Sequence, residues 1–330
     1  MQDATFSPCD QADLEAVRAF LGASVEDLRR RGRFDGMERD PDQTVATIFD
    51  LLTSQRFGYL GRRKSEPYRE TICALIRRNV DEGRPIRFYY DIGPGYHASV
   101  RPGSLGLDFE VGLAELVLLR QVVLFCEGVV GIHRPGARFH LVVDNLCGLA
   151  TNDVPLERTT GYVARLRSLI DAVGAGDLIE VLVESELNDW ETYRGHLERT
   201  PGGAPTDPSG LDAAAIDNVA RFLGRSCAAD EAARRIDLYA RTGPVTEELL
   251  EPAIDGVRMT QRASPTTIGF RAFPGGAQRI QVGRLGLLWS GPGKLRPVLL
   301  TTRNVDEYEV CEADARASAP IRSVLVARRR

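Results

Sequence analysis

The fold is constrained most by a long, mostly apolar run followed by a short buried strand that ends in an acid. Residues 108–130 contain few polar side chains and predict a core helix. The next apolar segment, Phe139–Val143, predicts a buried strand, and Asp144 follows it directly. Because α/β proteins present side chains to ligands at such strand ends, the pattern predicts an α/β fold with a site near Asp144.

Strands and helices alternate through the first part of the chain. Asp40-Pro41 is typical of an N-cap followed by proline in the first turn, and it predicts a helix that ends near Ser54. The alternation predicts a mainly parallel, Rossmann-like sheet flanked by helices. The other predicted helices cover 67–81 and 155–173, and the other predicted strands cover 86–90 and 178–183.

The chain divides at residues 200–210, which are rich in proline and glycine and predict a linker or lid-like loop. Before this loop we expect an N-terminal helical segment over 1–65 and an α/β core over 66–199. After it we expect a helical and β part of the same domain over 211–330. In that last part, helices are predicted at 211–240 and 245–257, and short antiparallel strands at 267–273, 279–289 and 298–302.

The composition argues against nucleic-acid and membrane partners. The formal net charge is −4, and no apolar run reaches the roughly 18 residues of a membrane helix. The first residues lack the apolar core of a signal peptide. Six scattered cysteines without a C-x-x-C pair predict reduced core cysteines in a cytoplasmic protein. For Arg328–Arg330 we expect a solvated, frayed end, with contact to anionic partners as the alternative.

Three motifs lack residues that their chemistry requires. Gly93–Ala98 matches G-x-G-x-x-A, but Pro102 prevents the long helix that would hold a pyrophosphate. Ser290–Lys294 resembles a P-loop without its first glycine and its Ser/Thr. His196 and Glu198 have the spacing of half a facial iron triad, and no histidine follows them. We therefore expect neither a metal nor an organic cofactor.

Two acidic residues are the main candidates for chemistry. Asp144 can accept a proton or orient an ammonium group, and the alternative is an Asx cap or turn. Glu115 lies among leucines of the predicted core helix, where a carboxylate must be paired or functional. The alternative for Glu115 is a partly exposed helix face. Asp91 ends the preceding strand in the same way as Asp144.

Basic residues near these acids can bind a substrate. The guanidinium groups of Arg101 and Arg138 suit carboxylates and phosphates, with surface ion pairs as the alternative. His97 can act as a general base near neutral pH, or it is a loop histidine with a satisfied hydrogen bond. Arg258 and Arg262 precede a strand of the tail and can close over a ligand, unless they form a solvated helix end.

These segments resemble the isonitrile (isocyanide) synthase family, which includes proteins of pyoverdine- and paerucumarin-type pathways and of dityrosine synthesis. The likeness is strongest over about residues 44–175. The matching elements are the opening helix at Thr44–Leu52, the strand entry at Glu82–Ile86, the helix start with Glu115, Cys126, the P-G-A motif at Pro135–Ala137, the strand end at Val143–Asn145, and Tyr162.

The resemblance implies an enzyme that joins the α-amine of an amino acid to ribulose 5-phosphate. The sugar phosphate supplies the isonitrile carbon without a metal or organic cofactor. In this interpretation Asp144 orients or deprotonates the amine, and Glu115 acts as acid/base on the carbonyl partner with help from His97. The implied substrate-binding residues are Tyr96, Ser99, Arg101, Arg138, Asn145 and Arg262.

The chain departs from the family pattern at several of these positions. Ser99 stands where the family has a lysine, and Gly112 stands where it has an aspartate. In the tail, Thr260-Gln261-Arg262 stands where the family has a histidine-containing S-I-H-like element. Either Arg101 replaces the lost lysine, or the co-substrate differs. Three hypotheses therefore stay open: an isonitrile-synthase-like enzyme of bacterial specialised metabolism, a diverged member that modifies an amino-acid nitrogen without ribulose 5-phosphate, and a non-catalytic binding or partner protein. In the enzymatic cases we expect a partner enzyme in the same pathway.

Overall fold

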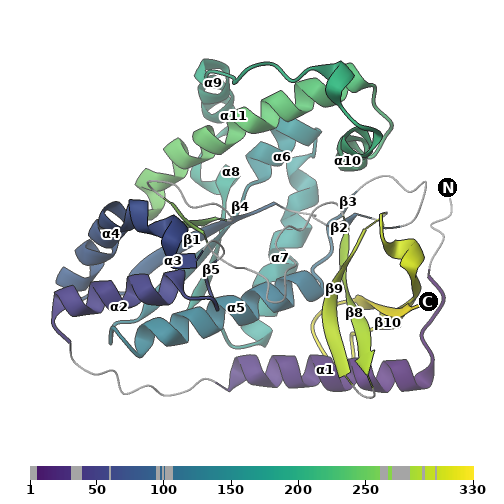
Figure 1. The fold of residues 1–330 in the computed structure, drawn as a ribbon, viewed down its shortest axis with the longest axis horizontal. Helices are drawn as coiled ribbons and strands as arrows, with labels where there is room; N and C mark the ends of the chain where they lie inside the picture. The colour runs from purple at the N-terminus through teal and green to yellow at the C-terminus, as the bar shows by residue number, and fades with distance from the viewer. Residues whose placement is uncertain are drawn as a thin grey trace.

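The computed structural model is built around a five-stranded parallel sheet with the strand order β5-β4-β1-β6-β7 (Figure 1). The predicted α/β fold with a mainly parallel sheet is confirmed. The strands of this sheet are β1 (Ile86–Ile92), β4 (Ala137–Val143), β5 (Ile179–Val183), β6 (Val257–Thr260) and β7 (Thr267–Gly269), while β2 (His97–Ala98) and β3 (Leu107–Asp108) form a separate short pair. The structure describes residues 6–30, 39–58, 61–93, 97–98, 100, 107–260, 267–269, 283–291, 294–301 and 303–330.

Helices connect the strands and cover both faces of the sheet (Figure 1). The N-cap predicted at Asp40 is present, because its side chain accepts a hydrogen bond from the backbone N–H of Gln43. Within the described ranges, no helix has both the length and the apolar character that crossing a membrane requires. The helices are α1 (Gln11–Arg29), α2 (Pro41–Thr53), α3 (Gly61–Ser65), α4 (Arg69–Asp81), α5 (Leu113–Val130), α6 (Asn145–Asn152), α7 (Leu156–Ala172), α8 (Glu184–Leu187), α9 (Trp190–Arg199), α10 (Ala213–Leu223) and α11 (Ala229–Ile254).

The two faces of the parallel sheet pack against different helices. Phe88 and Phe139 point to one face, where their rings contact Phe125 of α5. Tyr89 and Val142 point to the opposite face and belong to a core cluster with α11. Since side chains alternate along a strand, the residues that continue this second set beyond the strand ends lie on the α11 side of the sheet.

A second sheet contains β8 (Arg284–Gly291), β9 (Lys294–Leu300), β10 (Tyr308–Asp314) and β11 (Ser323–Arg329) in the order β10-β11-β8-β9. The pairs β8–β9 and β10–β11 are antiparallel, as expected for this part of the chain, and a parallel pairing of β11 with β8 joins them. Helix α1 lies along this sheet, at the bottom of Figure 1. Leu287 and Val326 share the main core with α1 and α5.

Two expectations about the ends of the chain are wrong. Cys9 and Cys311 form a disulfide, with their Cα atoms 5.1 Å apart, although all cysteines were expected to be reduced. Cys126 and Cys147 are buried thiols outside this disulfide, as expected. Arg328 belongs to β11 and forms an ion pair with Asp13 of α1, so this part of the C-terminus is neither frayed nor free for an anionic partner.

Some predicted boundaries also need correction. The core helix begins at Leu113 rather than near residue 108. The helix expected over 211–240 is interrupted, because Gly224 ends α10 in a left-handed conformation (φ 69°). Conversely, α11 continues through Pro244, where a gap was expected. Proline removes one backbone hydrogen bond there, but the fully buried Val245 and Leu250 keep the following turns packed. Strand β7 pairs in parallel with β6 rather than antiparallel.

Candidate functional site

Acidic residues follow or end three neighbouring strands at the carboxyl edge of the parallel sheet. Asp91 lies near the end of β1, Asp144 follows β4, and Glu184 follows β5. All three continue the set of side chains on the α11 side, because they are spaced by two from Tyr89, Val142 and Leu182. In an open α/β sheet this edge is where ligands bind.

Glu184 satisfies the N-terminus of α6 from outside that helix. Its Oε2 accepts hydrogen bonds from the backbone N–H groups of Leu146 (3.1 Å) and Cys147 (3.2 Å). Its Oε1 accepts a hydrogen bond of 3.0 Å from the hydroxyl of Thr246 on α11. The side chain is fully buried, and burial raises its pKa to about 7.

Asp144 occupies the N-cap position of α6 but makes no side-chain capping bond. Asp144 is therefore not an Asx cap. The backbone N–H groups that would donate to an N-cap side chain donate to Glu184 instead. Burial raises the pKa of the Asp144 carboxyl well above its usual value, and the neighbouring carboxylates of Glu184 and Asp91 raise it further. A carboxyl group of this kind is a strong proton acceptor once it is ionised.

Asp91 forms a buried ion pair with Arg258 of β6. The guanidinium Nε lies 3.0 Å from Asp91 Oδ2, and Nη1 lies 3.2 Å from Glu247 Oε2 on α11. Burial raises the pKa of Asp91, although Arg258 opposes the shift. Asp91 Oδ1 is buried and accepts no hydrogen bond. Arg258 thus neutralises the acids on the β1 and α11 side, and Asp144 has no such cationic partner within hydrogen-bond distance among the described side chains.

A cavity of about 390 Å³ opens beside Asp144, between α6, α10 and α11. This volume lies in the range of small-molecule sites. Its outer part is largely apolar, and Tyr239 lies at the surface with 61% of its area exposed. The lining residues are Gly93, Asp144, Cys147, Gly148, Thr151, Asn152 and Val154 on one side, and Ala215, Asn218, Val219, Phe222, Arg235, Ile236 and Tyr239 on the other.

Arg235, the arginine of the described lining, is engaged by the protein itself. Its Nη1 donates hydrogen bonds to the backbone oxygen of Thr151 (2.9 Å) and to Asp153 Oδ1 (3.1 Å). Asp153 also pairs with the second terminal nitrogen. The described part of the cavity therefore presents one acid and an apolar wall, and its arginine is already neutralised.

The structure places Glu115 outside this cavity. Its Oε2 accepts a hydrogen bond of 2.7 Å from the backbone N–H of Gly112, and its Oε1 accepts one of 3.2 Å from Tyr162 Oη. The first bond is half of a capping box at the start of α5. These bonds show Glu115 as a paired, buried carboxylate that holds the helix start, and its predicted acid/base role stays a prediction.

Asn145 and Arg138 lie at opposite ends of the parallel sheet. Asn145 is buried beside Asp144, but its amide binds Ser185 and Thr159, so it braces α6. Arg138 lies at the amino end of β4, six residues before Asp144, which is about 20 Å at roughly 3.3 Å per residue. It is exposed and forms an ion pair with Glu180 at 3.1 Å. The structure thus does not bring Arg138 close to Asp144, and its predicted binding of a phosphate or carboxylate stays a prediction.

The remaining predicted residues lie in or next to parts that the structure does not describe. Tyr96, Ser99, Arg101 and Arg262 are outside the described residues, and for His97 only the backbone in β2 is described. Val100, between Ser99 and Arg101 in the sequence, is buried in a cluster of the second sheet. Any role of these residues stays a prediction.

Sequence reasoning missed Glu184 and the contribution of α11. Glu184 could have been found, because it follows the buried strand Ile179–Val183 as Asp144 follows β4. Arg258 was noticed, but its pairing with Asp91 joins residues 167 positions apart and has no local signal. Among the described residues, Cys9, Asp13 and Cys311 lie within 4.8 Å of one another, away from this site, but the two cysteines form a disulfide and therefore offer no thiolate to a metal.

The fold and the site define an α/β protein with a small-molecule cavity at the carboxyl edge of its parallel sheet. Among solved structures, PvcA from Pseudomonas aeruginosa shares this fold with a TM-score of 0.60. The two chains are 17% identical, and the match covers 86% of this chain and 99% of PvcA. This chain therefore shares the fold of PvcA.

Other matches are weaker. A tyrosyl-tRNA synthetase from Archaeoglobus fulgidus has a TM-score of 0.34 at 12% identity, over 67% of this chain and 55% of the synthetase. The tyrosyl-tRNA synthetase of Leishmania major has a TM-score of 0.33 at 14% identity, over 65% of this chain and 26% of the synthetase. Both scores are too low to indicate a shared fold. No protein-family model and no curated protein matches the sequence.

Proposed function

We propose that this chain is an isonitrile-synthase-like enzyme that modifies the α-amine of an amino acid. The observation that carries the proposal is Asp144, an acid that makes no capping bond and lines a cavity of about 390 Å³. The PvcA fold supports the same reaction class. A carboxylate that has no cation within hydrogen-bond distance among the described residues is suited to bind a substrate that brings its own positive charge, such as an ammonium group.

In this proposal Asp144 receives one proton from the ammonium group and becomes a neutral acid. The burial that raises its pKa favours the neutral product of this transfer. The neutral amine is then free to add to a carbonyl carbon, forming a C=N bond with loss of water. The apolar wall that includes Val219, Phe222 and Ile236 would receive the side chain of the amino acid.

Ribulose 5-phosphate is the proposed carbon donor in the first version of this function. The experiment is mass spectrometry of products formed by the purified full chain with a panel of amino acids, with and without ribulose 5-phosphate. We expect an isonitrile product only when the sugar phosphate is present, and no product from Asp144→Asn. A fully active Asp144→Asn variant would contradict the assignment. Glu186→Gln, an exposed site on α8, is the matched control.

A second candidate is nitrogen-centred tailoring of an amino acid without a sugar phosphate. The pairing of Arg235 with Asp153 favours it, because that arginine is not free to hold a phosphate. The same experiment separates the two: this version predicts amino-acid binding without a product that depends on ribulose 5-phosphate. A partner enzyme would then be needed to supply or consume the modified amino acid.

A further inference from the structure

We propose that Glu184 is a positioning residue that caps α6 in place of Asp144 and thereby keeps the Asp144 carboxylate available to the cavity. The role of Asp144 in substrate binding rests on the proposed function, but the capping exchange itself does not. At the first turn of α6, Asp144 holds the N-cap position, but the side chain of Glu184 binds the helix amides.

The first step concerns the amides of α6. A helix leaves its first N–H groups without partners, and an aspartate at the N-cap normally accepts from the second or third of them. In α6 these are Leu146 and Cys147, and both donate to Glu184 Oε2. The Asp144 side chain makes no capping bond. Glu184 therefore performs the function that the sequence position assigns to Asp144.

The second step concerns how Glu184 is held. Its other oxygen accepts the Thr246 hydroxyl of α11. Next to it, the Asn145 amide donates to Ser185 Oγ (2.8 Å) and accepts from the Ser185 backbone N–H (3.0 Å). Reciprocal hydrogen bonds thus join the first residues of α6 and α8. We call this set of bonds, made by Glu184 and Ser185 to the start of α6, the clasp. A side chain fixed at this many points has one geometry, as a positioning residue requires.

The third step concerns the cavity wall. Cys147, Gly148 and Thr151 of α6 line the cavity together with Asp144, and Thr242 of α11 binds Cys147 Sγ at 3.3 Å. The clasp through Glu184 therefore sets the orientation of one complete wall.

The test is a crystal structure of Glu184→Ala together with the wild type. We expect the Asp144 carboxylate to turn and accept from the amides of Leu146 and Cys147, leaving the cavity. Glu184→Gln keeps an acceptor oxygen in place, so Asp144 should stay as in the wild type. An Asp144 side chain that does not move in Glu184→Ala would overturn the proposal.

Hydrogen exchange supplies a measurement that needs no crystal. The Leu146 and Cys147 amides should exchange at the wild-type rate in Glu184→Gln and in the control Glu186→Gln. If Glu184→Ala folds poorly, Ser185→Ala weakens the same clasp from the other side and should accelerate exchange in α6. Unchanged exchange of the α6 amides in Ser185→Ala would contradict the clasp.

Kinetics then connect the clasp to the proposed function. With an accepted amino acid as the probe, Glu184→Ala should raise KM about 10- to 100-fold, the effect of losing a hydrogen bond to a charged group, and should also lower kcat, because the turned Asp144 no longer faces the amine. Glu184→Gln should restore most of the affinity. If Asp144 turns in the crystal while Asp144→Asn is fully active, the proposed function fails and the positioning role of Glu184 stands.

Discussion

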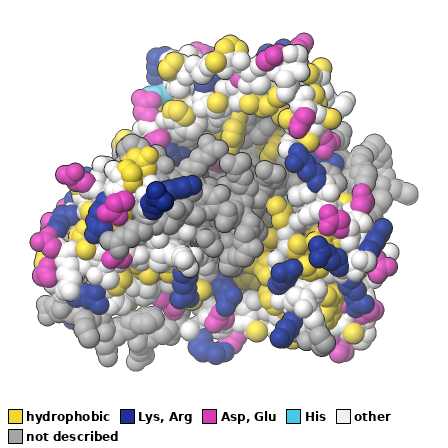
Figure 2. All heavy atoms as spheres, viewed as in Figure 1, with side chains coloured by type: hydrophobic (Ala, Val, Ile, Leu, Met, Phe, Trp, Pro, Cys, Tyr) yellow, Lys and Arg dark blue, Asp and Glu magenta, His cyan; other side chains and the backbone are white. Residues whose placement is uncertain are grey.

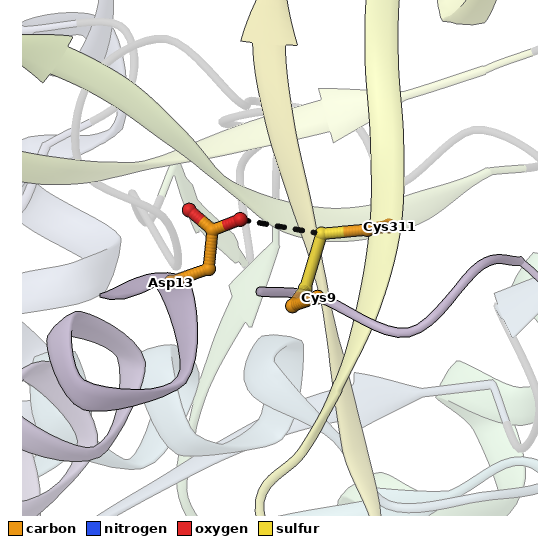
Figure 3. A group of neighbouring side chains, drawn as sticks. All are labelled: Cys9, Asp13 and Cys311. Atoms are coloured by element: carbon orange, nitrogen blue, oxygen red, sulfur yellow. Dashed lines mark hydrogen bonds between the residues drawn. A yellow bond between two sulfur atoms is a disulfide. The ribbon is translucent and has the colours of Figure 1, made fainter. Parts of the chain in front are cut away.

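Two aspartates, the buried Asp13 and the half-buried Asp144, show how differently the surroundings of the two sheets stabilise a negative charge. Asp13 packs on the second sheet, where its Oδ1 accepts from Trp289 Nε1 (2.8 Å) and Arg328 Nη2 (2.7 Å). Beside it the Cys9–Cys311 disulfide joins the N-terminal segment to β10 (Figure 3). Asp144, at the edge of the parallel sheet, has neither a cationic partner within hydrogen-bond distance among the described residues nor a helix to cap.

The two acids differ in their bonds: Asp13 has donors from other parts of the chain, whereas Asp144 makes no capping bond. Asp13 gains its stabilisation within the folded chain, because each bond ties α1 to the second sheet. In the proposed function, Asp144 gains part of its stabilisation from the substrate, as residues of active sites do. On the face shown in Figure 2, the acidic and basic side chains of the described residues are intermixed.

The largest expected effect is on the parallel-sheet side. Asp144→Asn should lower turnover about 100- to 10,000-fold, the usual range for a lost acid–base group. The free energy of unfolding should not fall, because Asp144 makes no capping bond and burial disfavours its charge. Steady-state kinetics and urea unfolding of the same preparation would check this. A large loss of stability would make Asp144 structural, as Asp13 is.

On the second sheet, reduction of the Cys9–Cys311 disulfide should lower the free energy of unfolding by about 2–5 kcal/mol. The bond closes a loop between residues separated by 302 positions, and it therefore restricts the unfolded chain strongly. Urea unfolding with and without a reductant would measure the change, with Cys9→Ser as the variant that should not respond to the reductant. An equal response in Cys9→Ser would attribute the effect to something other than this bond.

The two sheets should also respond to pH with opposite signs. The pKa of Glu184 is about 7 in the folded chain against an ordinary 4.5, so the folded state keeps a proton that the unfolded state has lost. Stability contributed by Glu184 should therefore fall as the pH rises from about 4.5 to about 7, by at most about 3 kcal/mol. On the second sheet, hydrogen bonds from Arg316 lower the pKa of Asp314 to about 2, so its contribution is lost on acidification below about pH 4.

Unfolding of wild type and Glu184→Gln at several pH values would isolate the first of these effects. The difference between the two proteins should change between pH 4.5 and pH 7 and stay constant above that range. A difference that is independent of pH would show that Glu184 does not titrate in this interval. Asp314→Asn should leave the change above pH 4.5 intact.

The smallest expected effect concerns Asp13. Asp13→Ala should lower the free energy of unfolding by about 2 kcal/mol, because Trp289 Nε1 and Arg328 lose a charged acceptor. Turnover should not change, since these bonds lie in the second sheet. Thermal or urea unfolding with a parallel activity assay would measure both quantities. Asp13→Asn keeps one acceptor oxygen and should lose less.

The sequence by itself determined the local elements and one end of the site. Asp40 and Pro41 predict the start of α2, because the preferences of N-cap residues and of proline depend on only a few neighbouring residues. The apolar run Phe139–Val143 predicts β4 and places Asp144 at the carboxyl edge, because parallel strands expose their ends there. Resemblance to a family predicted the fold in the same region. Arg138 lies far from Asp144 although only six positions separate them, because an extended strand rises roughly 3.3 Å per residue.

Only the tertiary structure decided what each acid does. Glu184 accepts a hydrogen bond from the backbone N–H of Leu146, 38 positions away in the sequence. Because of this contact, Asp144 does not cap α6. Cys9 and Cys311 are 302 positions apart, so composition could not distinguish this pair from the free cysteines. The physical reason is the same in both cases. Local pattern specifies backbone conformation, whereas the pairing of buried polar groups depends on which segments the core brings together.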